Sequence, residues 1–150
     1  MTNLGLGFHG GQRGYWPQLV NSDYDFTADT GAQAAYTVFT VTGDVLIHAL
    51  FGICQTSVTG AGTIELGIVG NTAALIAQTT AADLIENEIW FDGSPTTTLE
   101  KIDFTALSLV ITNGTDISFL IGGGADVTAG VINFHCIWSP LSTDGNIVAA

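Results

Sequence analysis

The hydrophobic and polar positions of residues 44–55 predict one long β-strand. The segment carries β-branched and aromatic residues without a helical stripe, and at about 3.3 Å per residue it would span roughly 40 Å. Both alternating sets of positions are mostly apolar: the odd set is Val45, Ile47, Ala49, Phe51 and Ile53, and the even set is Leu46, His48, Leu50, Gly52 and Cys54. A strand that is apolar on both faces must be covered on both. One cover is an opposing sheet, and for the other we expect a second copy of the chain rather than a further element.

From residue 35 onward the pattern predicts short strands throughout. Glycine or proline lies in many of the gaps, which is typical of an antiparallel sandwich or barrel. One helical turn is expected over 81–86, and no segment has a stripe long enough for a substantial helix. The expected strands are 36–41, 44–55, 63–69, 74–77, 88–91, 99–104, 107–112, 116–121 and 131–138.

Two of these strands, 107–112 and 116–121, are predicted to form a hairpin around Asn113 and Gly114. An odd loop of three or five residues would pair Ile111 with Ile117 and keep the apolar residues on one face. Gly114 is then expected at positive φ. In the last strand, the even positions Ile132, Phe134, Cys136 and Trp138 are predicted to face the core.

Residues 1–33 differ from the body, 34–150, in being rich in glycine and lacking a lasting hydrophobic period. We interpret them as an extended N-terminal arm. Its apolar residues need cover, and aromatic residues on a backbone that proline keeps extended suit a peptide that docks on a partner. The alternative is that the arm packs along its own domain or a neighbouring subunit. The expected partner-binding residues are Phe8, Arg13, Tyr15, Trp16 and Pro17.

Charge and composition narrow the classes of partner. The chain has only two basic residues, Arg13 and Lys101, against 14 carboxylates, and a formal net charge of -12. Neither nucleic acid nor an anionic membrane surface is therefore expected as a partner. Hydrophobic residues make up 47% of the chain and charged residues 11%, without an apolar run of transmembrane length. The start of the chain has no basic or apolar segment typical of a secretory signal. The apolar surface is expected in a subunit or partner interface.

Candidate chemistry is sparse. His48 and His135 lie in predicted strands, but no recurring carboxylate or metal-ligand spacing accompanies them. We expect them, with Leu46 and Leu50, in a subunit interface; a metal held by histidines around a threefold axis is the alternative. Cys54 and Cys136 are expected to be buried free thiols, and no catalytic residue, metal or other cofactor is expected.

Three stretches, 39–47, 62–84 and 88–95, resemble a family of small virion proteins of tailed bacteriophages. The most distinctive part is 67–83, which begins Gly-Ile-Val-Gly-Asn-Thr-Ala-Ala-Leu. The resemblance implies a capsid decoration (cement) protein or head-fibre base: a homotrimeric, jelly-roll-like β-sandwich on the outer surface of the capsid, bound to the major capsid protein and made in the bacterial host cytoplasm. A tail, baseplate or head-fibre component is one alternative. A carbohydrate-binding module is another, because Trp16, Trp90 and Trp138 could stack on sugars.

Overall fold

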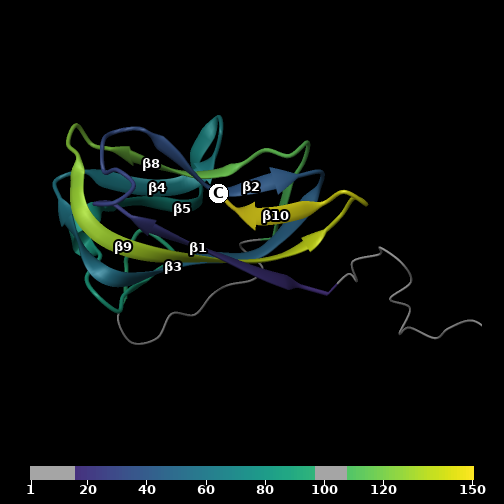
Figure 1. Cartoon of the computed structure of the whole chain (residues 1–150), viewed down its shortest axis with the longest axis horizontal. Coiled ribbons are helices and arrows are strands. Elements are labelled where there is room, and N and C mark those ends of the chain that lie inside the picture. The colour runs from purple at the N-terminus through teal and green to yellow at the C-terminus, as the bar shows by residue number, and fades with distance from the viewer. Residues whose placement is uncertain (1–15, 97–107) are drawn as a thin grey trace, which may run out of the picture.

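The computed structural model describes residues 16–96 and 108–150, which form two antiparallel β-sheets packed face to face (Figure 1). The predicted all-β sandwich is confirmed. The first sheet has the order β1-β9-β3-β6, with β7 also paired to β3; its strands are β1 (Gln18–Asp25), β3 (Val45–Gly60), β6 (Ile89–Trp90), β7 (Leu109–Ile111) and β9 (Val127–Pro140). The second sheet has the order β10-β2-β8-β4-β5; its strands are β2 (Ala35–Thr42), β4 (Thr63–Ile68), β5 (Asn71–Thr80), β8 (Ile117–Gly122) and β10 (Asn146–Ala149).

The long strand predicted from residue 44 onward is β3, which has 16 residues and lies inside the first sheet. It pairs with β9 along most of its length, while β7 and β6 share its other edge. A single 3-10 turn, η1 (Ala81–Asp83), lies within the segment expected to be helical. No helix in the described part of the chain is long and apolar enough to cross a membrane.

A β-bulge in β3 changes which positions face the core, so the expected strict alternation is wrong. The register with β9 shifts between Ile47 and Ala49, leaving His48 as the extra residue. Before the bulge the odd positions Val45 and Ile47 are buried in the core, and after it the even positions Leu50, Cys54 and Val58 are buried there. The bulge therefore changes the core-facing positions of β3 from odd to even.

The predicted hairpin between residues 107 and 121 is also wrong. Ile111 pairs with Val45 in the first sheet, whereas Ile117 pairs with Phe39 and Ile68 in the second. The connection containing Asn113 and Gly114 thus crosses between the two sheets. The expected positive φ of Gly114 is confirmed at 63°. A side chain there would also come within 2.9 Å of the Val41 carbonyl oxygen.

The core lies between the sheets and is rich in aromatic side chains. The even positions of β9 face it as predicted, with Ile132, Phe134, Cys136 and Trp138 all buried. Trp90 is completely buried, and its Nε1 donates a hydrogen bond of 2.8 Å to Thr79 Oγ1. Cys54 and Cys136 are buried and free, which confirms the expectation of two unpaired thiols.

The boundary of the predicted N-terminal arm is wrong, because residues 18–25 are a strand of the sandwich. β1 pairs with β9 from Gln18 opposite Trp138 to Asp25 opposite Val131. The short C-terminal strand β10, which the sequence pattern did not predict, pairs with β2. The strand expected at 99–104 and the arm residues 1–15 lie outside the described residues.

Candidate functional site: the outer face of the first sheet

The candidate site is the side of the first sheet that points away from the second sheet. We call it the outer face. Side chains point alternately to the two faces of a sheet along each strand. The positions of β1, β3, β6, β7 and β9 that do not face the core therefore form the outer face. These are Leu19, Asn21, Asp23, Asp25, Leu46, His48, Ala49, Phe51, Ile53, Ile89, Val110, Val131, Asn133, His135, Ile137 and Ser139.

The strand register arranges the outer face in rows. Ile137 lies between Leu19 and Ala49, and His135 lies between Asn21 and Phe51. Leu19 is 65% exposed and is one of the most exposed large apolar side chains of the described residues. Charged groups are confined to the margin of β1, so the centre of the face carries no carboxylate and combines apolar side chains with the neutral polar groups of β3 and β9.

His48 is held beside the bulge of β3. Its Nε2 forms a hydrogen bond of 2.8 Å with the Oγ of Ser139, and the neighbouring Leu46 lies between Ser139 and Val110 in the sheet. The bulge projects His48 onto the outer face rather than into the core. The imidazole is thus a fixed polar group within an apolar surface.

His135 is stacked on Phe51, with ring centroids 5.2 Å apart and an interplanar angle of 17°. Burial lowers the pKa of His135, and this effect outweighs the charge of Asp23, which raises it. Asp23 accepts a hydrogen bond from the Nδ2 of Asn133. Burial therefore favours the neutral imidazole of His135, which packs with Phe51 on the outer face.

Three of the four predicted interface residues, Leu46, His48 and His135, share the outer face. Leu50 does not, because the bulge turns it into the core of its own subunit, where its exposed fraction is 0%. The interface assignment of Leu50 is corrected accordingly. Within the described residues no three His, Cys, Asp or Glu side chains lie close enough together to hold a metal ion.

The predicted arm residues are only partly placed. Trp16 and Pro17 directly precede β1, and Trp16 is 74% exposed. Phe8, Arg13 and Tyr15 lie outside the described residues. Trp16 thus lies exposed just before the start of β1, three residues from the exposed Leu19.

The tryptophans that suggested carbohydrate binding are mostly inaccessible. Trp90 and Trp138 have exposed fractions of 0% and 2%, so neither can stack on a sugar. Their burial removes most of the reason for that alternative, and only Trp16 remains exposed.

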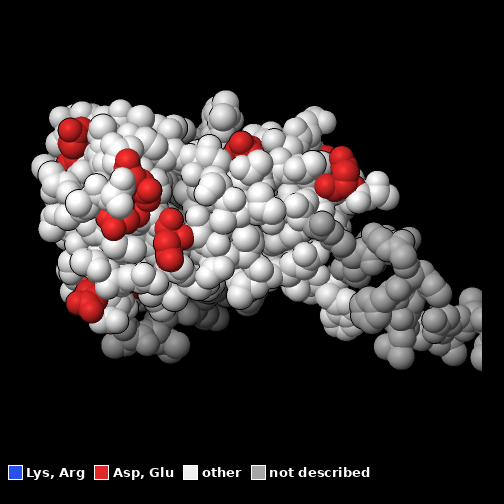
Figure 2. Space-filling model, viewed as in Figure 1, with Lys and Arg blue, Asp and Glu red and all other residues white. Residues whose placement is uncertain are grey.

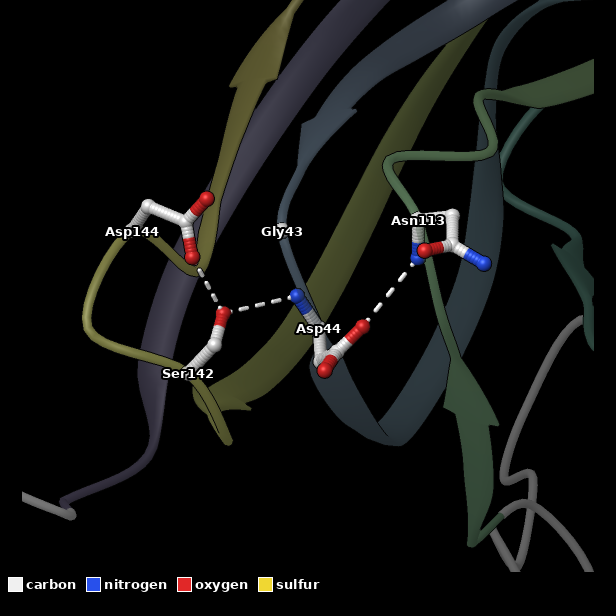
Figure 3. A pocket seen from close by; sticks show the side chains of 5 residues that line it. All are labelled: Gly43, Asp44, Asn113, Ser142 and Asp144. Carbon is white, nitrogen blue, oxygen red and sulfur yellow. Dashed lines mark hydrogen bonds between the residues drawn. The ribbon is translucent and has the colours of Figure 1, made fainter.

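A second feature that the sequence analysis missed is a shallow polar pocket of about 390 Å³ (Figure 3). It is lined by Gly43, Asp44, Asn113, Ser142 and Asp144, which come from three separate turns. Ser142 Oγ donates a hydrogen bond of 2.6 Å to Asp144 Oδ1 and accepts one of 2.9 Å from the Asp44 backbone nitrogen. Asp44 Oδ1 in turn accepts a bond of 3.1 Å from the Asn113 backbone nitrogen.

These hydrogen bonds tie the three turns together at one end of the sandwich. Gly43 has a φ of 61°, and a Cβ there would lie 2.5 Å from Asp144 Oδ1, so the turns pack too closely for a side chain. In the sequence, the only indication of this pocket was a set of residues common in turns, Gly-Asp and Asp-Gly. Their convergence depends on the fold.

The surface charge of the described residues is entirely acidic. Figure 2 shows carboxylates gathered mostly toward one end of the sandwich and no basic side chain. Both basic residues, Arg13 and Lys101, lie outside the described residues. Copies of such a chain repel one another wherever carboxylates meet, and the centre of the outer face carries no carboxylate.

Comparison of the chain with protein-family models, with curated proteins and with solved structures found no match in any of the three. The fold and the site define an acidic all-β sandwich with an apolar outer face.

Proposed function

We propose that the chain is a virion structural protein: a capsid decoration protein that assembles as a homotrimer on the outer surface of a tailed-phage head. The observation that carries the proposal is the outer face, on which Leu46, Phe51, Ile53 and Ile137 form a group of apolar side chains on a chain whose described charged residues are all acidic. A surface of this kind favours contact between subunits.

The apolar side chains of the outer face would contribute to self-assembly. Burying one Leu, Ile or Phe side chain contributes about 1.5 to 3 kcal/mol. Association costs about 4 to 15 kcal/mol in lost freedom before any affinity remains. Several such side chains from each subunit must therefore be buried together, and the outer face provides them on one sheet.

The strand connectivity supports a jelly-roll interpretation of the sandwich. With β7 and β10 taken as additions, the order β1-β9-β3-β6 in one sheet and β2-β8-β4-β5 in the other corresponds to the two four-stranded sheets of a double Greek key. Double-sheet jelly rolls of this type occur in viral capsid and lectin domains, among others. The architecture is therefore compatible with the virion role without specifying it.

The proposed capsid partner is the major capsid protein, contacted through the segment that precedes β1. Phe8, Arg13, Tyr15, Trp16 and Pro17 would make this contact. Three such segments on one trimer would bind with avidity, because the second and third contacts are effectively intramolecular. In this proposal the chain is made in the host cytoplasm and acts on the assembled head.

Two measurements test the proposal. Sedimentation velocity of the purified chain should give a trimer, and a monomer at all accessible concentrations would contradict the assembly. Cryo-electron microscopy of the virion should place the protein in many copies over the head. Confinement to a few copies at the tail, baseplate or a fibre would instead favour the alternative virion role.

Capsid binding can be tested separately with heads that lack the protein. The purified chain should bind such heads and delay their disruption on heating. A Trp16→Ala variant should bind more weakly, whereas Val69→Ala, which alters another highly exposed apolar side chain away from the segment, should bind normally. Equal binding by the two variants would exclude Trp16 as a contact.

A further inference from the structure

The free edge of β1 is a candidate docking site for another strand. β1 pairs with β9 through eight consecutive residue pairs without a register shift. Within the described residues no strand pairs with its other edge. Proteins usually protect such an edge with Lys, Pro, a bulge or a cover. From Gln18 to Ser22 the strand has neither Lys nor Pro nor a bulge, and Asp23 and Asp25 stand only at its far end.

A segment suited to this edge precedes β1 in the same chain. Residues 4–8 are Leu-Gly-Leu-Gly-Phe, in which Leu4, Leu6 and Phe8 alternate with glycines. A period of two with apolar residues on one side only is the pattern of a strand that buries one face. In a register that puts these three side chains on the same side as Leu19, the added strand would extend the apolar surface of the outer face.

The length and direction of the chain favour a second copy as the acceptor. Residues 9–17 can span roughly 30 Å when extended, which is enough to reach a neighbouring subunit. Figure 1 shows β1 beginning at the end of the sandwich where β9 leads into β10. There Trp16 is 74% exposed and Pro17 is exposed, so the start of β1 is not packed into the core of its own subunit.

We propose that residues 3–8 of one copy add as a strand to the free edge of β1 in a second copy. This inference rests on the proposed self-assembly, but not on the proposed capsid role. It reassigns Phe8 and Arg13 from the capsid contact to a contact between copies, and it leaves Tyr15, Trp16 and Pro17 for the capsid. A strand passed from each copy to the next is a head-to-tail contact, and such a contact closes into a ring when its rotation matches the number of copies. Exchange of this segment thus provides a geometric route to a closed trimer.

Cysteine cross-linking between two different variants tests the exchange directly. The native cysteines are buried, so introduced cysteines are the only exposed ones among the described residues. A Leu6→Cys chain mixed with a chain carrying Leu19→Cys, Asn21→Cys or Asp23→Cys should form a disulfide-linked pair of chains with at least one partner. Thr40→Cys, exposed on the second sheet, is the matched control and should not.

Two cross-linking results would overturn the inference. One is a level of cross-linking no higher than with Thr40→Cys for every position on β1. The other is a cross-link that forms only within a single chain carrying both cysteines, which would show that the segment returns to its own subunit.

Deletion of residues 2–8 separates this inference from the proposed assembly. If the full chain is a trimer and the deletion variant a monomer, the exchange is supported; Leu6→Asp should behave like the deletion, and Thr2→Asp like the unaltered chain. If both the full and the shortened chains are trimers, the exchange is wrong and the trimer stands. If the full chain is itself a monomer, both are wrong.

Discussion

Two leucines of β3, four residues apart, provide a test of the bulge and of the outer face together. Leu50 is completely buried in the core of one subunit, whereas Leu46 is partly exposed on the outer face. We expect Leu50→Ala to lower the stability of the subunit, and Leu46→Ala to weaken contact between subunits. The same chemical change should thus give two different results.

The magnitudes follow from burial. Truncating a fully buried leucine to alanine costs about 2 to 5 kcal/mol, a large part of the roughly 5 to 15 kcal/mol that stabilises a typical domain. In a chain of this length each kcal/mol lowers Tm by about 2 to 4 °C. Leu50→Ala should therefore lower Tm by roughly 4 to 20 °C. For Leu46→Ala the loss is expected in association, at about 1 to 3 kcal/mol for each subunit contact.

Denaturant unfolding followed by tryptophan fluorescence, repeated over a range of protein concentrations, distinguishes the two effects. Leu50→Ala should shift the midpoint at every concentration. Leu46→Ala should shift it mainly where the unaltered chain is assembled, because binding between native subunits stabilises them by mass action. Sedimentation velocity should show a weakened trimer for Leu46→Ala only. If Leu46→Ala leaves both the trimer and the concentration dependence unchanged, the outer face around Leu46 is not a subunit contact.

Three further predictions concern single groups. Since the pKa of His135 is lowered from 6.5 in the folded state, the unfolded state binds the proton more readily; stability should fall as pH drops below 6.5, and His135→Gln should reduce this dependence in pH-resolved thermal unfolding. Thr79→Val leaves Trp90 Nε1 without its acceptor and should cost about 1 to 3 kcal/mol in denaturant unfolding, whereas an unchanged midpoint would show that the bond contributes nothing. Burial raises the pKa of Cys54 to about 11 and that of Cys136 to about 12, so a thiol reagent at pH 8 should label both only after unfolding; rapid labelling of the folded chain would contradict their burial.

The sequence pattern predicted the class of fold and the positions of most described strands, because alternation and turn residues are local signals. β1 was missed for a physical reason. As an edge strand it has polar residues on both faces, with Gln18 and Ser22 on one side and Asn21 and Asp23 on the other. It therefore lacks a continuous apolar face and resembles an irregular segment. β10 is short and contributes one core side chain, Ile147.

The sheet to which a strand belongs could not be predicted from its apolar face. Ile111 and Ile117 both point into the same core, but they do so from opposite sheets. An apolar residue that faces the core gives the same hydrophobic pattern in the sequence whichever of the two sheets carries it. The face pattern was therefore correct for both strands, while their pairing depended on long-range contacts that alternation does not encode.

The candidate site was partly predictable for the same reason. Leu46, His48 and His135 were assigned to an exposed apolar face from their positions in strands, and they share the outer face. Their surroundings, including the stacking of His135 on Phe51 and the bond from His48 to Ser139, required the register between β3 and β9. The polar pocket required the convergence of three turns, which no local pattern indicates.

The bulge at His48 explains part of the apolar pattern that led us to expect a covering partner for β3. The remaining part still favours such a partner. A strand with two apolar faces has two explanations: both faces are covered along its length, or a bulge exchanges the faces partway. Here exchange accounts for Val45 and Leu50, which have opposite parity yet both face the core. It does not account for Leu46 before the bulge or Phe51 and Ile53 after it, because these remain on the outer face. Fewer apolar side chains of β3 therefore lie outside the core of one subunit than the sequence suggested, but those that do lie together on one surface.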